Sequence, residues 1–435
     1  MNRTFTPDGP LRGQVTPPAD KSISHRAALF GAMNDAPVTV RNYLDADDTQ
    51  STLNALRALG AGVDESSPGE MVIRGVGLHA ALETTEGRLD VGNSGTLLRL
   101  LPGWLAGQAG SAWTLDGDES IRRRPIDRVA KPLREMGATV DARDERFTPM
   151  TVHGADLRGI DYTLPVATAQ VKSCVLIAGM LAGGQTSVTE PAQSRDHTER
   201  MLARARVPFE RDGLTVRVSA TDELELEEIT VPADPSSAAF HAAAAAIVPR
   251  SRIVLCDVGL NWTRTAFFRI LERMGGVVVG ELEQPSSDGV PPLEPNGDVD
   301  ITQAPLEATE VGGDEVPLAI DELPLVALLG CFAEGETVVR NAEELRVKET
   351  DRLAATVDGL RGLGADIEAT DDGFVVRGGR GLKGGRIDAQ GDHRMAMLGA
   401  VAGLASREGV EVVGMEAAGV SYPGFEDDLA SLRGG

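Results

Sequence analysis

Two kinds of helix alternate along the 435-residue chain, and this alternation constrains the fold more than any other feature. The first kind is amphipathic and ends in a Leu/Met-Gly-Ala/Gly step before a β-branched strand. A glycine at that step suits a helix C-cap, where the left-handed conformation is favourable only without a Cβ atom. We predict four clear copies and two weaker ones, which span residues 47–63, 127–140, 263–279, 351–367, 195–209 and 425–435.

The second kind of helix is apolar on nearly every face, which is typical of helices buried in a core. Its six copies begin at or near residues 21, 95, 169, 236, 321 and 392. The sequence therefore predicts an α/β protein of six units, each with a buried helix, a strand, an outer helix and a strand. Three units in each of two domains is the simplest partition, because the chain is too long for one ordinary core. We place the break at residues 231–235.

The composition is that of a globular protein, with 42% hydrophobic and 25% charged residues. Cys174, Cys256 and Cys331 lie far apart in apolar stretches, which predicts buried thiols rather than a disulfide framework or a zinc site. The N-terminal residues lack the apolar segment of a signal peptide, and the longest apolar run, 238–249, is too short to cross a bilayer. We therefore expect a cytoplasmic protein without a membrane partner.

The formal net charge is −24, and only five of the 42 basic residues are lysines. Acid-rich, lysine-poor surfaces suit a cytoplasm of high salt, because the Debye length falls to about 3 Å at ~1 M salt. We interpret the composition as halophilic adaptation. It also argues against nucleic acid as a partner, since no basic patch is visible.

Charged and hydroxyl-bearing motifs fall at the predicted N-termini of the buried helices. A helix N-terminus presents free N–H groups and about half a positive charge, so it favours anions. Side-by-side repeats would gather these N-termini on one face of each domain, and two such faces would line an anion-binding cleft. The motifs are Lys21-Ser22, Asn93-Ser94-Gly95-Thr96, Thr168-Ala169-Gln170, Asp321-Glu322 and Asp392-His393-Arg394.

Eight cations in or near these motifs together indicate a strongly anionic ligand with phosphate and carboxylate groups. They are Lys21, Arg26, Arg99, Arg124, Arg195, Lys348, Arg352 and Arg394. Asp321 and Glu349 remain as isolated carboxylates available for proton transfer, and Lys348 is expected to stack on Arg352 at i, i+4. Each motif alone is also compatible with an ordinary helix cap or a surface ion pair. The glycine signatures of P-loop and Rossmann proteins are absent, which disfavours kinases and dehydrogenases.

Six motifs, in order and across nearly the whole chain, resemble the 5-enolpyruvylshikimate-3-phosphate (EPSP) synthase family of enolpyruvyl transferases. They are Asp20–Arg26, Gly92–Thr96, Arg124–Ile126, Ile320–Glu322, Arg346–Arg352 and Asp392–Met397. The resemblance implies an inverse α/β barrel fold of two domains, each with three βαβαββ repeats around buried parallel helices. The expected domains are 20–231, and 1–19 together with 232–435, with the active site in the interdomain cleft.

The resemblance also implies transfer of the enolpyruvyl group of phosphoenolpyruvate to the 5-hydroxyl of shikimate 3-phosphate. Asp321 would accept the hydroxyl proton, and Glu349, helped by Lys21, would protonate the methylene carbon. The implied ligands of phosphoenolpyruvate are Lys21, Gly95, Arg124, Gln170, Arg352 and Arg394. Those of shikimate 3-phosphate are Ser22, Arg26, Thr168, Ala169, Gln170, Arg195, Asp321 and Lys348. No metal or organic cofactor is implied, and we expect a monomer.

The chain departs from many relatives of this family at the Thr168-Ala169-Gln170 motif, where they have Ser-Ser-Gln. Arg195 is expected to replace some of the lost contacts. One alternative is the UDP-N-acetylglucosamine enolpyruvyl transferase branch, which typically has Lys-Asn at the first motif and a reactive cysteine before Arg-Pro. This chain has Lys21-Ser22 and no cysteine in Asp116–Arg124. A non-catalytic anion-binding protein would be expected to lose Asp321 or Glu349, and an RNA-phosphate cyclase is disfavoured by the negative charge.

Overall fold

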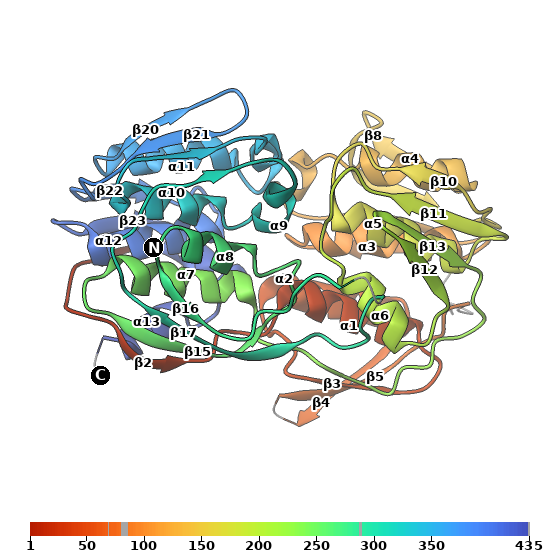
Figure 1. Ribbon diagram of the computed structural model, residues 1–435. Helices are drawn as coiled ribbons and strands as arrows, with labels where there is room; N and C mark the ends of the chain where they lie inside the picture. Colours follow the sequence, from red (N-terminus) through yellow and green to blue (C-terminus); the bar gives the residue numbers. More distant parts are fainter. Residues whose placement is uncertain (68, 80–85, 287–288, 434–435) are drawn as a thin grey trace. The chain divides into compact units, whose positions relative to one another are not determined.

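The chain forms two compact units in the computed structural model, which describes residues 1–435 except 68, 80–85, 287–288 and 434–435 (Figure 1). The first unit contains Ala19–Val231 and Ser286–Glu294. The second unit contains Met1–Pro18, Pro232–Pro285 and Pro295–Gly435. Each unit has its own cluster of buried apolar side chains.

The segment Ser286–Glu294 groups with the first unit, whereas the expected second domain includes all of 232–435. Contacts of His197 and Arg200 join the end of this segment to the rest of the first unit. The Nδ1 atom of His197 lies 2.6 Å from Glu294 Oε1, and Arg200 Nη1 donates to the backbone oxygen of Leu293 at 2.8 Å. Both pairings join positions about 95 residues apart, so the local sequence pattern does not reveal them.

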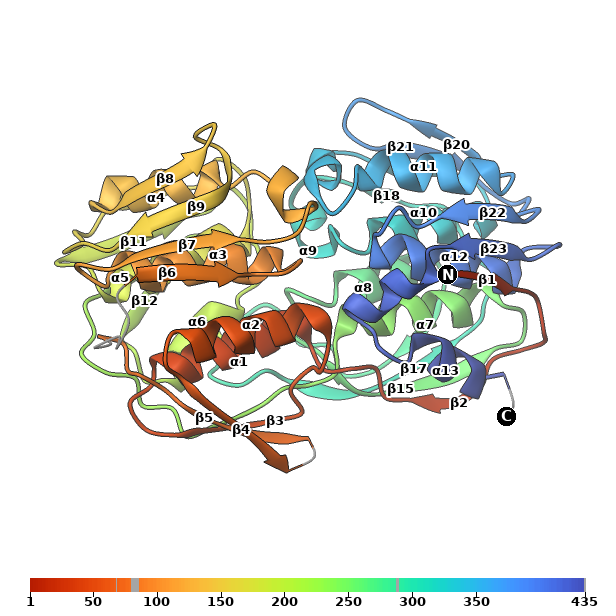
Figure 2. The ribbon, with the colours of Figure 1, turned by 180° about the vertical axis from the view of Figure 1, so that it is seen from behind.

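The first unit contains three four-stranded sheets (Figure 2). In each sheet the first two strands are parallel and the remaining pairs are antiparallel. The first sheet has the order β14 (Glu228–Thr230), β3 (Val38–Arg41), β5 (Glu70–Arg74) and β4 (Gly62–Ser67). The second has the order β6 (Glu86–Asp90), β7 (Ala112–Asp116), β9 (Phe147–His153) and β8 (Thr139–Arg143). The third has the order β10 (Asp161–Thr163), β11 (Gln185–Thr189), β13 (Thr215–Ser219) and β12 (Phe209–Asp212).

The second unit has two four-stranded sheets and one three-stranded sheet among its described residues, with strands drawn from both ends of the chain. One sheet has the order β16 (Val277–Val279), β17 (Asn296–Thr302), β15 (Arg252–Gly259) and β2 (Arg12–Val15). Another has the order β18 (Glu310–Val311), β19 (Glu336–Val339), β21 (Phe374–Arg377) and β20 (Asp366–Ala369). The third has the order β1 (Asn2–Phe5), β23 (Val410–Val413) and β22 (Gly385–Asp388).

The helices alternate between buried and outer positions as the sequence predicts. The buried helices are α1 (Lys21–Met33), α3 (Gly95–Ala106) and α5 (Ala169–Met180) in the first unit, and α7 (Pro235–Ile247), α10 (Leu323–Phe332) and α12 (His393–Ala405) in the second. The outer helices are α2 (Asp47–Ala58), α4 (Asp127–Met136), α6 (His197–Arg204), α8 (Ala266–Arg273), α11 (Arg352–Gly362) and α13 (Phe425–Ser431). The short helices are η1 (Ile121–Arg123), η2 (Gly313–Glu315), α9 (Val316–Ala319), η3 (Glu343–Val347) and η4 (Met415–Val420).

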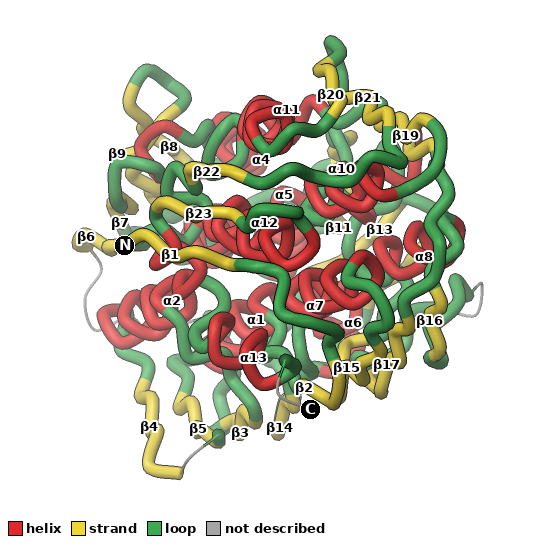
Figure 3. Tube along the Cα trace, turned by 90° about the vertical axis from the view of Figure 1, so that its left-hand side faces the viewer, coloured by secondary structure: helices red, strands yellow, loops and turns green. Residues whose placement is uncertain are grey.

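The buried helices of each unit pack against one another through small residues. Figure 3 shows α7, α10 and α12 in the middle of the second unit, with strands of its three sheets around them. In the first unit a Cβ atom on Gly103 of α3 would lie 2.3 Å from the backbone oxygen of Cys174 in α5. Only glycine allows this approach of the two helices.

The predicted glycine C-caps are confirmed. Gly60, Gly137, Gly275 and Gly364 follow the outer helices α2, α4, α8 and α11, and all four have φ values between +93° and +113°. In the weaker copy after α6, Arg206 takes this position with φ +56°, which is costlier for a residue with a Cβ atom.

The cysteine prediction is partly wrong. All three cysteines are free, and Cys174 and Cys331 are buried, but Cys256 is only half-buried because its side of β15 is partly open. Among the described residues no helix is long and apolar enough to cross a membrane.

Candidate active site

The first turn of α1 carries a cation that is fixed by a buried carboxylate. Asp20 caps the helix by accepting from the backbone N–H of Ile23 at 2.9 Å. The ammonium group of Lys21 lies 2.8 Å from Asp48 Oδ2, at the start of α2. Burial by itself raises the pKa of the Asp48 carboxyl, but Lys21 and His25 hold this pKa below its usual range. Asp48 is therefore ionised and fixes the position of the Lys21 ammonium.

Arg26 lies one turn further along α1 and is almost fully buried. Its guanidinium donates to Ser22 O at 2.9 Å, to Ser173 Oγ at 2.8 Å and to Thr198 Oγ1 at 2.8 Å. The first bond places the Arg26 guanidinium beside Ser22, one turn earlier in α1. The pKa of Arg26 is lowered to about 10, mainly by burial and to a smaller extent by the nearby Arg195, against the opposing effect of Glu199 and Asp20. Two cations close together in a buried place favour an anion as ligand.

The N-termini of α3 and α5 meet in the same unit. Gln170 Nε2 donates to Thr96 Oγ1 at 3.2 Å, and Arg124 Nη2 donates to Asn93 Oδ1 and Ser120 Oγ, each at 3.3 Å. A Cβ atom on Gly95 would lie 2.5 Å from Arg124 Nη1, so the backbone N–H groups here stand directly beside a guanidinium. This arrangement suits an anionic oxygen.

Only one arginine of the run Arg122-Arg123-Arg124 belongs to this group. Arg122 forms an ion pair with Asp116 at 2.7 Å, and Arg123 is exposed. Arg124 is buried because η1 turns it inward, toward the start of α3.

A buried ion cluster lies behind the start of α5. Lys172 Nζ is 2.7 Å from Glu190 Oε2 and 2.7 Å from Glu199 Oε1. Burial lowers the pKa of Lys172, but Glu199 and Glu190 outweigh it and hold this pKa above its usual value. Glu190 also accepts the hydroxyl of Ser194, which precedes Arg195. Lys172 therefore connects the helix that carries Thr168, Ala169 and Gln170 with the segment that carries Arg195.

In the second unit one guanidinium joins three carboxylates. Arg352 is 1% exposed at the start of α11. It donates to Asp392 Oδ2 at 2.9 Å, to Asp321 Oδ1 at 3.3 Å and to Glu349 Oε2. Lys348 Nζ donates to Asp321 Oδ1 at 3.1 Å. The pKa of Asp392 lies below its usual value because Arg352 outweighs the effect of burial.

Two details of this region differ from the sequence prediction. Lys348 and Arg352 do not share a helix, because η3 ends at Val347, Lys348 is extended and Asp351 caps α11. They approach each other through Asp321 instead. Asp321 and Glu349 are also not isolated, since Arg352 forms an ion pair with each of them. This pairing keeps two carboxylates side by side without strong mutual repulsion.

Arg394 lies at the start of α12 and is held from one side. Its Nη1 atom donates to the backbone oxygen of Asp321 at 3.1 Å and to Glu322 Oε1 at 3.4 Å. Asp392 caps the helix by accepting from the Arg394 N–H at 2.9 Å. The predicted residues of the second unit thus converge on the starts of α10, α11 and α12.

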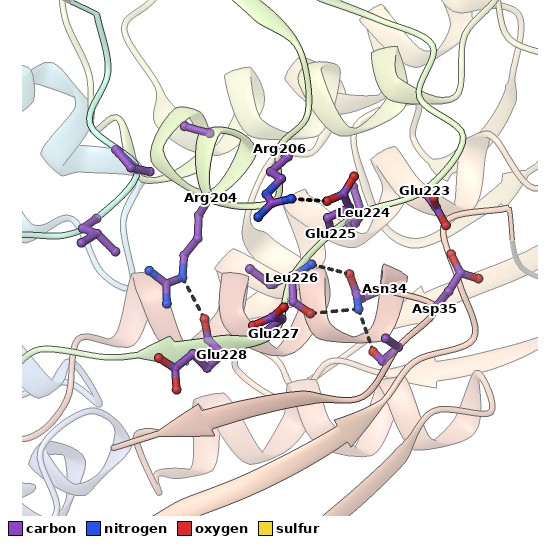
Figure 4. Close-up of a pocket in the computed structure, with 14 residues that line it drawn as sticks. Asn34, Asp35, Arg204, Arg206, Glu223, Leu224, Glu225, Leu226, Glu227 and Glu228 are labelled. Carbon is purple, nitrogen blue, oxygen red and sulfur yellow. Dashed lines mark hydrogen bonds and ion pairs between the residues drawn. The ribbon is translucent and has the colours of Figure 1, made fainter.

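A cavity of about 700 Å³ in the first unit contains none of the predicted residues. It lies between the end of α1, the end of α6 and residues 223–228 (Figure 4). Figure 4 shows Arg206 directed at Glu225, at 2.6 Å, and Arg204 at the backbone oxygen of Glu228, at 2.8 Å. Its arginines already have protein partners. In the described part of the chain, no three His, Cys, Asp or Glu side chains are grouped to hold a metal ion.

The two groups of residues can therefore hold several anionic oxygens and place two carboxylates for proton transfer. A sequence model of the EPSP synthase (3-phosphoshikimate 1-carboxyvinyltransferase) family matches residues 5–429. The chain belongs to the EPSP synthase family.

Relatives of the EPSP synthase family agree over nearly full length. The chain is 48% identical to a 3-phosphoshikimate 1-carboxyvinyltransferase of Bacillus subtilis strain 168 over 425 residues, which cover 97% of each chain. It is 45% identical to the enzyme of that name from Bacillus cereus strain G9842, with 99% of each chain covered. The structure matches EPSP synthase from Acinetobacter baumannii with a TM-score of 0.85 and 38% identity, over 99% of this chain and 98% of that one. The enolpyruvyl transferase NikO from Streptomyces tendae shares the fold, with a TM-score of 0.76, 18% identity and coverage of 99% and 96%.

For this EPSP synthase family member, the sequence prediction assigned no role to the residues that hold the predicted site residues in place. Asp48, Lys172, Glu199 and Glu322 are all buried and all contact a predicted residue or its helix. One signal was available for Lys172, because a lysine inside an otherwise apolar helix requires a buried partner. Nothing in the local pattern distinguishes Asp48 from its exposed neighbour Asp47.

Proposed function

We propose that the chain transfers the enolpyruvyl (carboxyvinyl) group of phosphoenolpyruvate to the 5-hydroxyl of shikimate 3-phosphate and releases inorganic phosphate. The reaction belongs to the shikimate pathway of aromatic amino acid biosynthesis. The observation that carries this proposal is the pair Asp321 and Glu349, which one buried guanidinium, Arg352, holds together beside Lys348. Family membership over residues 5–429 supports the same reaction.

In the proposed mechanism, the two carboxylates of the second unit move protons. Asp321 accepts the proton of the 5-hydroxyl while the hydroxyl oxygen bonds to C2 of phosphoenolpyruvate. A proton carried by Glu349, with help from Lys21, goes to C3, which becomes a methyl group. The C2–O bond to phosphate then breaks, and a methyl proton leaves to restore the double bond.

The first unit would hold the charged groups of the substrates. Lys21, Gly95, Arg124 and Gln170 are proposed for phosphoenolpyruvate, together with Arg352 and Arg394 of the second unit. Ser22, Arg26, Thr168, Ala169, Gln170 and Arg195 are proposed for shikimate 3-phosphate, together with Asp321 and Lys348. These cations stabilise phosphate and carboxylate charge most strongly where water is excluded.

Phosphate release from phosphoenolpyruvate tests the proposal. The chain is assayed with shikimate 3-phosphate or with UDP-N-acetylglucosamine as acceptor. Release that requires shikimate 3-phosphate is the expected result. Release only with the sugar nucleotide would place the chain in the other enolpyruvyl transferase branch, and no release with either acceptor would favour a non-catalytic anion-binding protein.

We also propose that the enzyme works best at high salt. The support is the charge of −24 and the use of arginine in exposed ion pairs, such as Arg377 with Glu336, Asp366 and Glu368. Screening by salt reduces the repulsion among the excess carboxylates. Activity and melting temperature should both rise between dilute buffer and molar KCl, and unchanged values would refute the proposal.

A further inference from the structure

The guanidinium of Arg394 presents one edge to the protein and leaves another open. Nη1 makes both side-chain hydrogen bonds, to Asp321 O and to Glu322 Oε1. Nη2 lies 3.8 Å from Asp321 Oδ2, which is an ion pair but too long for a hydrogen bond. Among the described residues Nε and Nη2 donate no hydrogen bond. Arginine frequently binds a carboxylate through two such parallel donors.

Glu322 reaches Arg394 from the start of α10. Its side chain is 3% exposed, and its Oε1 atom accepts from the hydroxyl of Ser236 as well as from Arg394. Ser236 in turn accepts from Arg264 Nη2 at 3.0 Å, and the same Nη2 lies 2.8 Å from Asp234 Oδ1. The relay Arg264–Ser236–Glu322–Arg394 joins the starts of α7, α10 and α12.

Arg352 is a useful comparison, because its guanidinium is occupied by protein carboxylates on every side. All three nitrogens of the Arg352 guanidinium contact protein carboxylates. The hydrogen-bond acceptors of the Arg394 guanidinium are on Nη1 alone, at a position that Glu322 and the Asp321 backbone fix together. Glu322 is thus placed to orient the guanidinium of Arg394 without using the donors on its Nε–Nη2 edge.

We propose that Glu322 is a positioning residue that turns the Nε–Nη2 edge of Arg394 toward the carboxylate of phosphoenolpyruvate. The inference rests on the proposed function, because phosphoenolpyruvate supplies the carboxylate that Arg394 would bind. Glu322 does not contact the substrate in this scheme. It acts on phosphoenolpyruvate through Arg394, and it leaves the binding of shikimate 3-phosphate unaffected.

Steady-state kinetics of Glu322→Leu and Glu322→Gln test the inference. Glu322→Leu should raise the KM for phosphoenolpyruvate about tenfold, the usual effect of losing a hydrogen bond to a charged group. Glu322→Gln keeps an acceptor oxygen and should raise this KM less, as a conservative rescue. The KM for shikimate 3-phosphate and kcat should stay within about twofold of the wild type. The reason is that binding of the carboxylate is weakened equally in the ground state and in the transition state.

Glu315→Leu is the matched control, since Glu315 pairs with Arg273 in the same region of the chain but contacts none of the proposed site residues. It should leave both KM values unchanged. A double-mutant cycle with Arg394→Ala identifies the route of the effect. If Glu322 acts through Arg394, Glu322→Leu should add nothing to the KM of the Arg394→Ala enzyme.

If the wild type is active, three results would overturn the inference and leave the proposed function standing. They are a KM for phosphoenolpyruvate that is unchanged in both Glu322 variants, equal increases of both KM values, and additive effects in the cycle. A wild type without phosphate release dependent on shikimate 3-phosphate would instead overturn the proposed function, and the inference with it.

Discussion

The first unit gathers mainly cations at its buried-helix N-termini, whereas the second unit gathers carboxylates with their counter-ions. Around α1, α3 and α5 the predicted charged residues are the cations Lys21, Arg26, Arg99, Arg124 and Arg195, and Asp48 is the carboxylate that Lys21 contacts. Around α10, α11 and α12, Asp321, Glu322, Glu349 and Asp392 surround Lys348, Arg352 and Arg394.

The two units share the same repeat and the same helix dipoles, so the difference lies in side-chain charge. A mainly cationic group favours binding of phosphate, and a mixed group can place a carboxylate for proton transfer without repelling anions. In the proposed mechanism, one fold that is used twice has both proton-transferring carboxylates in one copy and most of the substrate-binding residues in the other. Each of the following predictions can contradict or refine that division.

The largest effect is expected from the carboxylates of the second unit. Asp321→Asn and Glu349→Gln should each lower kcat by about 10²–10⁴-fold, the usual contribution of a general acid or base. Pre-steady-state phosphate release and kcat are the measurements. Near-normal kcat in both variants would mean that the proton transfers occur elsewhere, and the division between the units would be wrong.

In the first unit the buried lysine should matter more for stability than for catalysis. Lys172→Met leaves Glu190 and Glu199 buried together and should cost about 3–5 kcal/mol of the free energy of unfolding. Denaturant titration measures this cost. Lys131→Met is the matched control because Lys131 is exposed on α4, and it should change stability little. Equal effects of the two variants would show that the buried ion cluster contributes nothing to stability.

Acid should destabilise the second unit through His241 in α7. Burial lowers the pKa of His241 to about 4, from the usual 6.5. As the pH falls, the unfolded chain therefore binds this proton before the folded chain does. The free energy of unfolding is unaffected by His241 above pH 6.5 and falls by about 3 kcal/mol as the pH drops toward 4. His241→Asn should flatten this part of the stability profile, measured by denaturant titration at each pH. An unchanged slope would refute the assignment.

A smaller effect is expected from Asp48, which fixes Lys21 in the first unit. Asp48→Asn should raise the KM for phosphoenolpyruvate about five- to tenfold, because a charge-assisted contact with Lys21 is lost. Asp47→Asn changes the exposed neighbour and should have no effect. If the two variants behaved alike, the position of Lys21 would not depend on Asp48.

The sequence was sufficient for the repeated elements and for the placement of several motif residues at helix starts. Helix periodicity and the glycine caps are local signals, and Gly60, Gly137, Gly275 and Gly364 all have the predicted left-handed conformation. The motif residues Lys21, Gly95 and Arg394 could be placed at helix starts for the same reason.

What could not be predicted depends on pairs of residues that are far apart in the chain. Apart from Glu349, the partners of Arg394 and Arg352 are 31 to 73 residues away, and the choice of Glu322 over other carboxylates follows from packing. The helix break at Lys348 was missed because the charge spacing at i, i+4 resembles that of a continuous helix, whereas Asp351 starts a new one.

The closure of the second unit by strands from both ends of the chain affects the order in which the protein can fold during synthesis. Strand β1 pairs with β23, and Asn2 lies opposite Val413. At a translation rate of about 5–20 residues per second, β1 must wait roughly 20–80 s for its partner. Most of the first unit is a continuous stretch that leaves the ribosome much earlier. We expect nascent chains to contain a folded first unit well before the second one closes.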